Sequence, residues 1–221
     1  MVETVSTVNR TRPTLGREEI ARAALAMIDE EGINALSMRR LADRLGVGTM
    51  TLYGYFRSKQ ELLDGAVAIA TEDFEFEMPE GGMRERIRAH QQAVRRMLER
   101  HPALPELRGR QPLVQPAAFR MTEPAMQILL DAGFPPDEAP RAFRVLFVYM
   151  LGSMMFGGVE PSPDQRRIVR SALQLLPEDE FPAVTATADG IAASVGGREQ
   201  FDYGLERIID GLEARLAALH G

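Results

Sequence analysis

Apolar residues in this chain recur every three or four positions and seldom every second position. Residues spaced in this way share one face of an α-helix, whereas a half-buried strand alternates with a period of two. Glycine and proline clusters separate the periodic segments, as expected between helices. The sequence therefore predicts an all-α protein.

The first three predicted helices are short and closely spaced. We expect the first over residues 17–31, with Gly32 ending it, and the second after Ser37, whose hydroxyl is a good N-cap. Gly46 stops the second helix, residues 46–48 make a tight turn, and the third helix covers residues 49–56. Two short helices joined by a three-residue turn are typical of a helix-turn-helix.

Longer periodic segments follow. Ser58 is expected to cap the next helix, with Glu61 completing a capping box. Two stretches, 157–164 and 177–197, are expected to be flexible connections. Further helices are predicted at Met83–Arg100, Pro116–Phe119 and onward, Glu123–Asp131, Pro136–Phe156, Asp164–Leu176 and Glu199–Leu219.

The third short helix has an unusual outer face. Leu52 and Phe56 lie one turn apart and should anchor the helix to the core, which leaves Met50, Thr51 and Tyr53 facing outward beside a glycine. The DNA major groove admits one helix, whose hydroxyl groups can bond to base edges or phosphates. The alternative is a polar surface on a helical domain that binds protein.

Charge is distributed unevenly along the 221 residues, although the net charge is −6. Residues 1–60 carry nine basic and seven acidic side chains, a net +2, and the remainder carries 17 basic and 25 acidic side chains, a net −8. A basic segment in an acidic chain suits contact with nucleic acid.

Several classes of site and location are disfavoured by composition. The absence of cysteine removes disulfides and thiolate sites, and the three histidines lack ligand spacing, so we expect no cofactor and no metal. The start has no apolar leader, and the uncharged run 145–159 is shorter than the roughly 20 residues of a membrane helix. We therefore expect a cytoplasmic protein that does not span a membrane.

The segment from Gly16 to Val67 resembles the DNA-binding domain of the TetR family of transcriptional regulators. The similarity lies in "ALSMRRLADRLGV", "TLY", the aromatic Phe56 and "SKQELL". It implies a helix-turn-helix domain over residues 1–60, with an N-terminal arm at 1–15, and a ligand-binding and dimerisation domain over 61–221.

The resemblance also implies which residues contact DNA. Arg39, Thr49 and Met50 would read bases. Ser37, Tyr53 and Lys59 would hold phosphates. The full expected set is Ser37, Met38, Arg39, Thr49, Met50, Thr51, Tyr53, Tyr55 and Lys59.

For the acidic remainder, the resemblance implies a homodimer through helices around Pro136–Phe156 and Glu199–Leu219. Candidate residues of an effector pocket are Met97, Phe119, Met126, Phe147, Met150 and Met154, for each of which core filling is the alternative. Arg120 or Gln127 could fix a polar ligand.

The function expected from these features is that of a ligand-responsive repressor that binds a near-palindromic DNA operator and is released by a small-molecule effector. A transcriptional activator of the same fold and a small-molecule carrier that does not bind DNA remain alternatives. A helical hydrolase is disfavoured because the sequence contains no "HExxH", "GxSxG" or phosphate loop.

Overall fold

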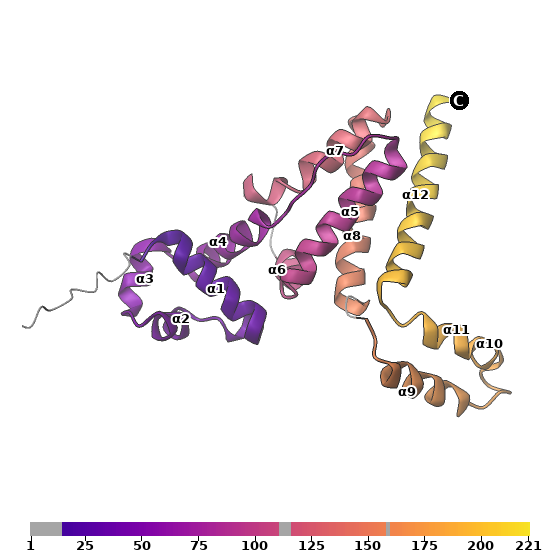
Figure 1. Ribbon diagram of the computed structural model, residues 1–221, viewed down its shortest axis with the longest axis horizontal. Coiled ribbons are helices and arrows are strands. Elements are labelled where there is room, and N and C mark those ends of the chain that lie inside the picture. The colour runs from indigo at the N-terminus through magenta and orange to yellow at the C-terminus, as the bar shows by residue number, and fades with distance from the viewer. Residues whose placement is uncertain (1–14, 111–115, 158–159) are drawn as a thin grey trace, which may run out of the picture. The chain divides into compact units, whose positions relative to one another are not determined.

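A computed structural model describes residues 15–110, 116–157 and 160–221, and in these ranges the chain is helical with no strand (Figure 1). The predicted all-α class is confirmed. The elements are α1 Arg17–Glu31, η1 Ile33–Ala35, α2 Met38–Leu45, α3 Thr49–Tyr55, α4 Lys59–Glu72, α5 Met83–Arg100, α6 Leu104–Arg110, η2 Pro116–Phe119, α7 Thr122–Asp131, α8 Ala139–Gly157, α9 Pro163–Gln174, α10 Pro182–Ala186, α11 Ala188–Ala193 and α12 Arg198–His220.

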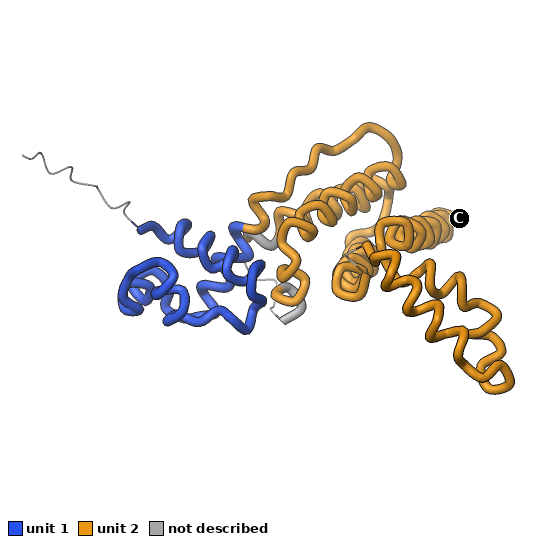
Figure 2. Tube along the Cα trace, turned by 60° about the horizontal axis from the view of Figure 1, so that its bottom comes forward, with its two compact units in different colours: residues 1–69 blue, residues 70–221 orange. Residues whose placement is uncertain are grey.

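The chain divides into two compact units, residues 1–69 and 70–221 (Figure 2). The boundary expected after residue 60 falls in the first turn of α4, and α4 continues through the division between the units. The first part of α4 packs within unit 1, since Leu62 and Ala66 are fully buried and Gly65 lies against Phe56.

The core of unit 1 consists of the apolar faces predicted from the sequence. Ile20 and Ile28 of α1, Leu41 of α2, Leu52 of α3 and Phe56 have no exposed surface. Burial of such side chains is the main contribution that stabilises short helices in a protein.

The turn between α2 and α3 follows from capping at both ends of α2. Ser37 Oγ accepts a hydrogen bond from the backbone N–H of Arg40 at 3.2 Å. At the other end Gly46 has φ +66°, and the N–H groups of Gly46 and Val47 donate to the carbonyls of Asp43 and Ala42. This Schellman motif favours glycine, so the predicted helix stop is confirmed.

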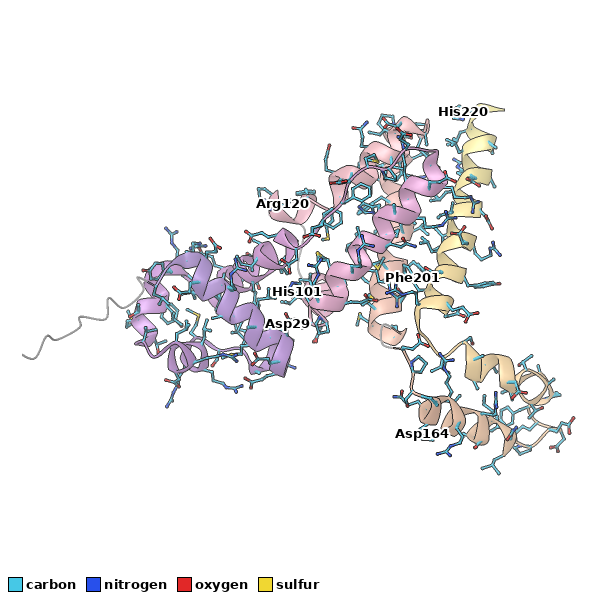
Figure 3. All side chains as sticks on the ribbon, viewed as in Figure 1. Asp29, His101, Arg120, Asp164, Phe201 and His220 are labelled. Atoms are coloured by element: carbon cyan, nitrogen blue, oxygen red, sulfur yellow. The ribbon has the colours of Figure 1, made fainter. Side chains whose placement is uncertain are left out.

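Unit 2 is a helical bundle in which α7 packs on α5 and α8, and α8 packs on α12. Phe201, in the first turn of α12, stacks on Tyr149 of α8 with 5.6 Å between ring centroids (Figure 3). The Tyr149 hydroxyl donates to the carbonyl of Phe201 at 2.8 Å. Arg84 of α5 forms ion pairs with Glu206, Asp210 and Glu213 along α12.

Two parts of unit 2 differ from expectation. The prediction of a flexible connection over 177–197 is wrong, because α10 and α11 form there and Ala188 and Ala192 of α11 are buried. The helix α6 was not predicted, although its Leu104 and Leu107 are fully buried. Helices of five to seven residues span too few turns to show an apolar period.

Among the described residues, no helix is long and apolar enough to span a membrane.

Two glycines of unit 1 allow a matched stability test. A Cβ at Gly65 would lie 3.0 Å from a ring carbon of the buried Phe56 and 3.3 Å from Ala21 Cβ, whereas a Cβ at Gly54 would meet nothing within 4 Å. We expect Gly65→Ala to lower the free energy of unfolding by about 1–3 kcal/mol through overpacking. We expect Gly54→Ala to raise it by up to about 1 kcal/mol through helix propensity. Urea unfolding at one fixed protein concentration measures both, and equal values for the two variants would contradict this packing.

Candidate functional site

The outer face of α3 is the most exposed apolar and hydroxyl surface of unit 1. Leu52 is fully buried, while Met50 is 78% exposed and Tyr53 is 44% exposed. Thr51 and Gly54 are also exposed, and Thr49 is half-buried at the first turn. The helix thus presents the short, exposed outer face expected from the sequence.

Two exposed basic side chains, on the helices before and after α3, have no carboxylate partner among the described residues. Arg39 of α2 and Lys59, the first residue of α4, are exposed and form no ion pair within the described part of the chain. Most other arginines of unit 1 pair with carboxylates, in the pairs Arg17–Glu61, Arg22–Glu18, Arg40–Glu31 and Arg44–Glu30. The unpaired cations are therefore those best able to bind phosphate.

Three other residues of the expected contact set have internal roles. Met38 is buried with 7% exposure, so its side chain belongs to the core of unit 1. The Tyr55 hydroxyl donates to the carbonyl of Leu15 at 2.6 Å. Ser37 accepts the N-cap hydrogen bond but keeps its own hydroxyl proton for a further acceptor. We therefore do not include the Met38 and Tyr55 side chains among the DNA contacts that we propose.

An ion pair fixes the end of α3 onto α1 and α4. The Arg17 guanidinium donates to Glu61 Oε1 at 2.7 Å and to the carbonyl of Tyr55, and lies 4.2 Å from the ring centroid of Phe56. Glu61 Oε2 accepts from the backbone N–H of Arg57 at 2.7 Å. The hydrogen bond from Arg17 is the largest cause of a lowered pKa at Glu61. We call Arg17 and Glu61 the clamp.

The clamp changes one detail of the capping box expected at the start of α4. Ser58 Oγ accepts from the backbone N–H of Glu61 at 3.1 Å, as predicted. The Glu61 carboxylate, however, bonds to Arg57 and Arg17 in place of the expected backbone N–H of Ser58. Glu61 therefore ties α4 to the residues that follow α3.

Unit 2 contains a small cavity of about 30 Å³ between α5, the start of α7 and α8. That volume accommodates about one water molecule, so a larger ligand requires side chains to move. Seven apolar side chains and three polar ones line it, namely His90, Gln91, Val94, Leu98, Met121, Thr122, Phe143, Phe147, Met150 and Leu151.

The structure brings only part of the predicted pocket together. Phe147 and Met150 line the cavity. Met97 is fully buried in the core, Phe119 is 47% exposed on η2, and Met126 lies half-buried on α7. Met154 lines a separate groove between α8 and α9.

The two polar positions suggested for ligand binding also lie elsewhere. Gln127 donates to Asp131 at 2.6 Å on the exposed side of α7, and Arg120 is exposed just before that helix (Figure 3). Sequence reasoning missed His90 and Gln91, which are 1% and 2% exposed. The sequence did contain a signal for these two residues, because they are polar and lie on the same inner face of α5 as Ile87, Val94 and Leu98.

Comparison with known families finds two matching models. Residues 20–66 match the model described as "Bacterial regulatory proteins, tetR family". Residues 77–216 match "Tetracyclin repressor-like, C-terminal domain". Together these models cover both compact units and most of the chain.

Individual relatives agree with the family models. An HTH-type transcriptional regulator of Saccharopolyspora erythraea is 31% identical, with 93% of this chain and 88% of the relative covered. The class D tetracycline repressor of Escherichia coli is 27% identical, with 93% and 92% covered. The solved complex of ActR from Streptomyces coelicolor with actinorhodin has a TM-score of 0.81 and 28% identity, with 92% and 97% covered.

The clamp predicts an unusual sign for a charge change. Electrostatics alone predicts that removing a carboxylate strengthens binding to DNA. We expect the opposite for Glu61→Gln, namely a several-fold weaker binding to operator DNA. The reason is that Arg17 loses its partner and the end of α3 becomes less firmly held. Fluorescence anisotropy on labelled operator DNA measures the affinity.

Glu19→Gln is the matched control, since Glu19 is exposed on α1 and has no ion pair within the described residues. It removes the same charge and should leave the affinity equal or slightly higher. Equal changes in the two variants would show that Glu61 acts only through its charge.

Burial predicts a pH dependence from His90. Burial is the largest cause of its shift and lowers its pKa to about 4, from an ordinary value near 6.5. Between these values only the unfolded chain takes up the proton, so the free energy of unfolding falls as pH decreases from 6.5 to 4, by up to about 3 kcal/mol from this residue. His90→Gln retains a donor for Met121 without titrating. We expect the stability difference between wild type and this variant to change over that pH window, and a constant difference in urea unfolding would contradict the neutral, buried imidazole.

Proposed function

Because the chain belongs to the TetR family of DNA-binding transcriptional regulators, we propose that it is a homodimeric repressor that binds a near-palindromic operator and is released by a small-molecule effector. The observation that carries this proposal is the exposed face of α3, together with the exposed cations Arg39 and Lys59 that form no ion pair among the described residues, within the segment that matches the family model.

The proposed DNA contacts combine base reading and phosphate binding. Arg39, Thr49, Met50 and Thr51 would face base edges, because arginine and hydroxyl groups bond to bases and methyl groups pack on thymine. Ser37, Tyr53 and Lys59 would bind phosphates. We propose that this reading function lies within residues 1–60, as expected from the sequence.

We propose dimerisation through α8 and α12. Val145 and Val148 of α8 are each 52% exposed, and Tyr203 of α12 is 60% exposed. Apolar side chains exposed on adjacent helices mark an association surface. A two-fold axis there would pair two copies of α3 with half-sites about one DNA turn apart, or a multiple of that spacing.

Release by an effector requires that the effector bind the DNA-incompetent arrangement more tightly than the DNA-bound one. The cavity between α5, α7 and α8 is the proposed effector site, since it is lined largely by apolar side chains and by a few polar ones. The complex of the related ActR with actinorhodin supports a small-molecule effector for this chain.

Variants that remove one proposed contact side chain test the interface. We expect Lys59→Ala and Tyr53→Ala to weaken binding to all DNA sequences and Arg39→Ala also to relax the sequence preference, each by about 1–3 kcal/mol. Lys59→Ala should in addition reduce the slope of log affinity against log salt by about 1 for each copy that binds. Titrations at several salt concentrations, on operator and on scrambled duplex, measure both quantities.

Arg167→Ala is the control, because it removes an exposed cation from α9 of unit 2 that pairs with Asp164. Its salt slope should equal that of the wild type. If Arg39, Tyr53 and Lys59 could all be replaced without effect on operator binding, α3 would not be the reading helix. A carrier without DNA function would show no salt-sensitive binding to any duplex.

A further inference from the structure

We propose that Gln91 is the residue that recognises the effector, and that the effector is an uncharged, mainly apolar molecule that presents a hydroxyl or N–H donor to Gln91 Oε1. This inference rests on the proposed effector site and specifies the chemistry of its ligand.

The hydrogen bonds of His90 determine its tautomer. His90 Nε2 lies 2.7 Å from the carbonyl oxygen of Met121. A carbonyl oxygen only accepts hydrogen bonds, so Nε2 must carry the hydrogen. The imidazole is 1% exposed, lies edge-on to the rings of Phe74 and Phe76, and has a pKa lowered to about 4 by burial. It is therefore neutral at pH 7, and its Nδ1 is an acceptor.

The tautomer of His90 in turn determines the orientation of the Gln91 amide. The amide nitrogen of Gln91 lies 3.3 Å from His90 Nδ1 and donates to it. The reverse orientation would place two acceptors against each other. Gln91 Oε1 therefore points away from His90.

Gln91 lines the cavity, and its Oε1 is a buried acceptor without a hydrogen-bond donor among the described residues. The residue is 2% exposed. A buried acceptor without a donor is destabilising, so a ligand that supplies a donor gains more than one that does not.

The rest of the cavity defines the other properties of the ligand. Among the described lining residues none is acidic, lysine or arginine, and Phe143, Phe147, Met150 and Leu151 of α8 provide an apolar wall. A carboxylate would lose its hydration without gaining a cation and would face the Gln91 acceptor. Aromatic rings and methionine sulfur favour flat, polarizable molecules, and methionine side chains can move to enlarge the space.

The test uses phenol and toluene, which have similar shape and differ in one donor. The full-length protein is labelled at its methionine methyl groups, because Met121 and Met150 line the cavity and report binding there by NMR. We expect both probes to shift these two signals. We expect the ratio of phenol affinity to toluene affinity to fall by about 5- to 10-fold in Gln91→Met, which keeps the side-chain length and removes the acceptor.

Thr122→Val is the matched control, since Thr122, like Gln91 and His90, is a neutral lining residue whose side chain can hydrogen-bond. The affinity ratio should stay at the wild-type value in this variant. If the ratio fell with Thr122→Val and not with Gln91→Met, the donor would bind Thr122 and the proposal would be wrong.

Anisole provides a test that needs no variant, because it replaces the phenol proton by a methyl group. It should bind the wild-type protein more weakly than phenol, and equal affinities would overturn the proposal. If neither phenol nor toluene shifted the NMR signals of Met121 and Met150 in the wild-type protein, the proposal would also be overturned. Operator binding by the same sample is measured separately, so failure at the cavity is distinguishable from failure of the proposed DNA function.

Discussion

The rest of the DNA-reading unit depends on how α3 is fixed. A helix of seven residues is too short to be stable alone, and nearly all of its outer face is left free for a partner. Its stability must therefore come from its inner side and its end. Leu52 and Phe56 supply the buried contacts, and the clamp of Arg17 and Glu61 holds the backbone after α3 to both α1 and α4. This leaves the exposed side chains of Met50, Thr51 and Tyr53 available for the DNA contacts that we propose.

The charged side chains of unit 1 are likewise divided between those in internal ion pairs and those that stay exposed. The protein is acidic overall, so long-range attraction to DNA is weak and contact must depend on a few local cations. Internal ion pairs neutralise most arginines of unit 1, whereas Arg39 and Lys59 are unpaired within the described residues on either side of α3. In unit 2 the polar groups of interest are uncharged and buried. The surface proposed to bind DNA and the cavity proposed for a neutral ligand thus differ in chemistry and lie in different units.

The sequence predicted the helices that are long enough to show a periodic apolar pattern. The helices α1 and α5 have the expected bounds because three to five turns give a clear apolar face, and the α2–α3 turn was recognised from Ser37 and Gly46. The short helices α6, α10 and α11 gave no such signal. Contacts between residues far apart in the sequence could not be predicted either. The hydrogen bond from Tyr55 to Leu15 spans 40 positions. The orientation of the Gln91 amide follows from the contact between His90 and Met121. The local sequence pattern therefore predicted the longer helices. It did not predict which side chains form hydrogen bonds with other parts of the chain.

The proposed function depends on two copies of α3 reading a symmetric DNA site. Selection of bound duplexes from a random pool by the full-length protein tests it most directly, because it assumes no operator. We expect the enriched sequences to contain an inverted repeat whose half-sites are separated by about one helical turn, or a multiple of it. Enrichment of no sequence, or of a single half-site without its inverted copy, would contradict the claim.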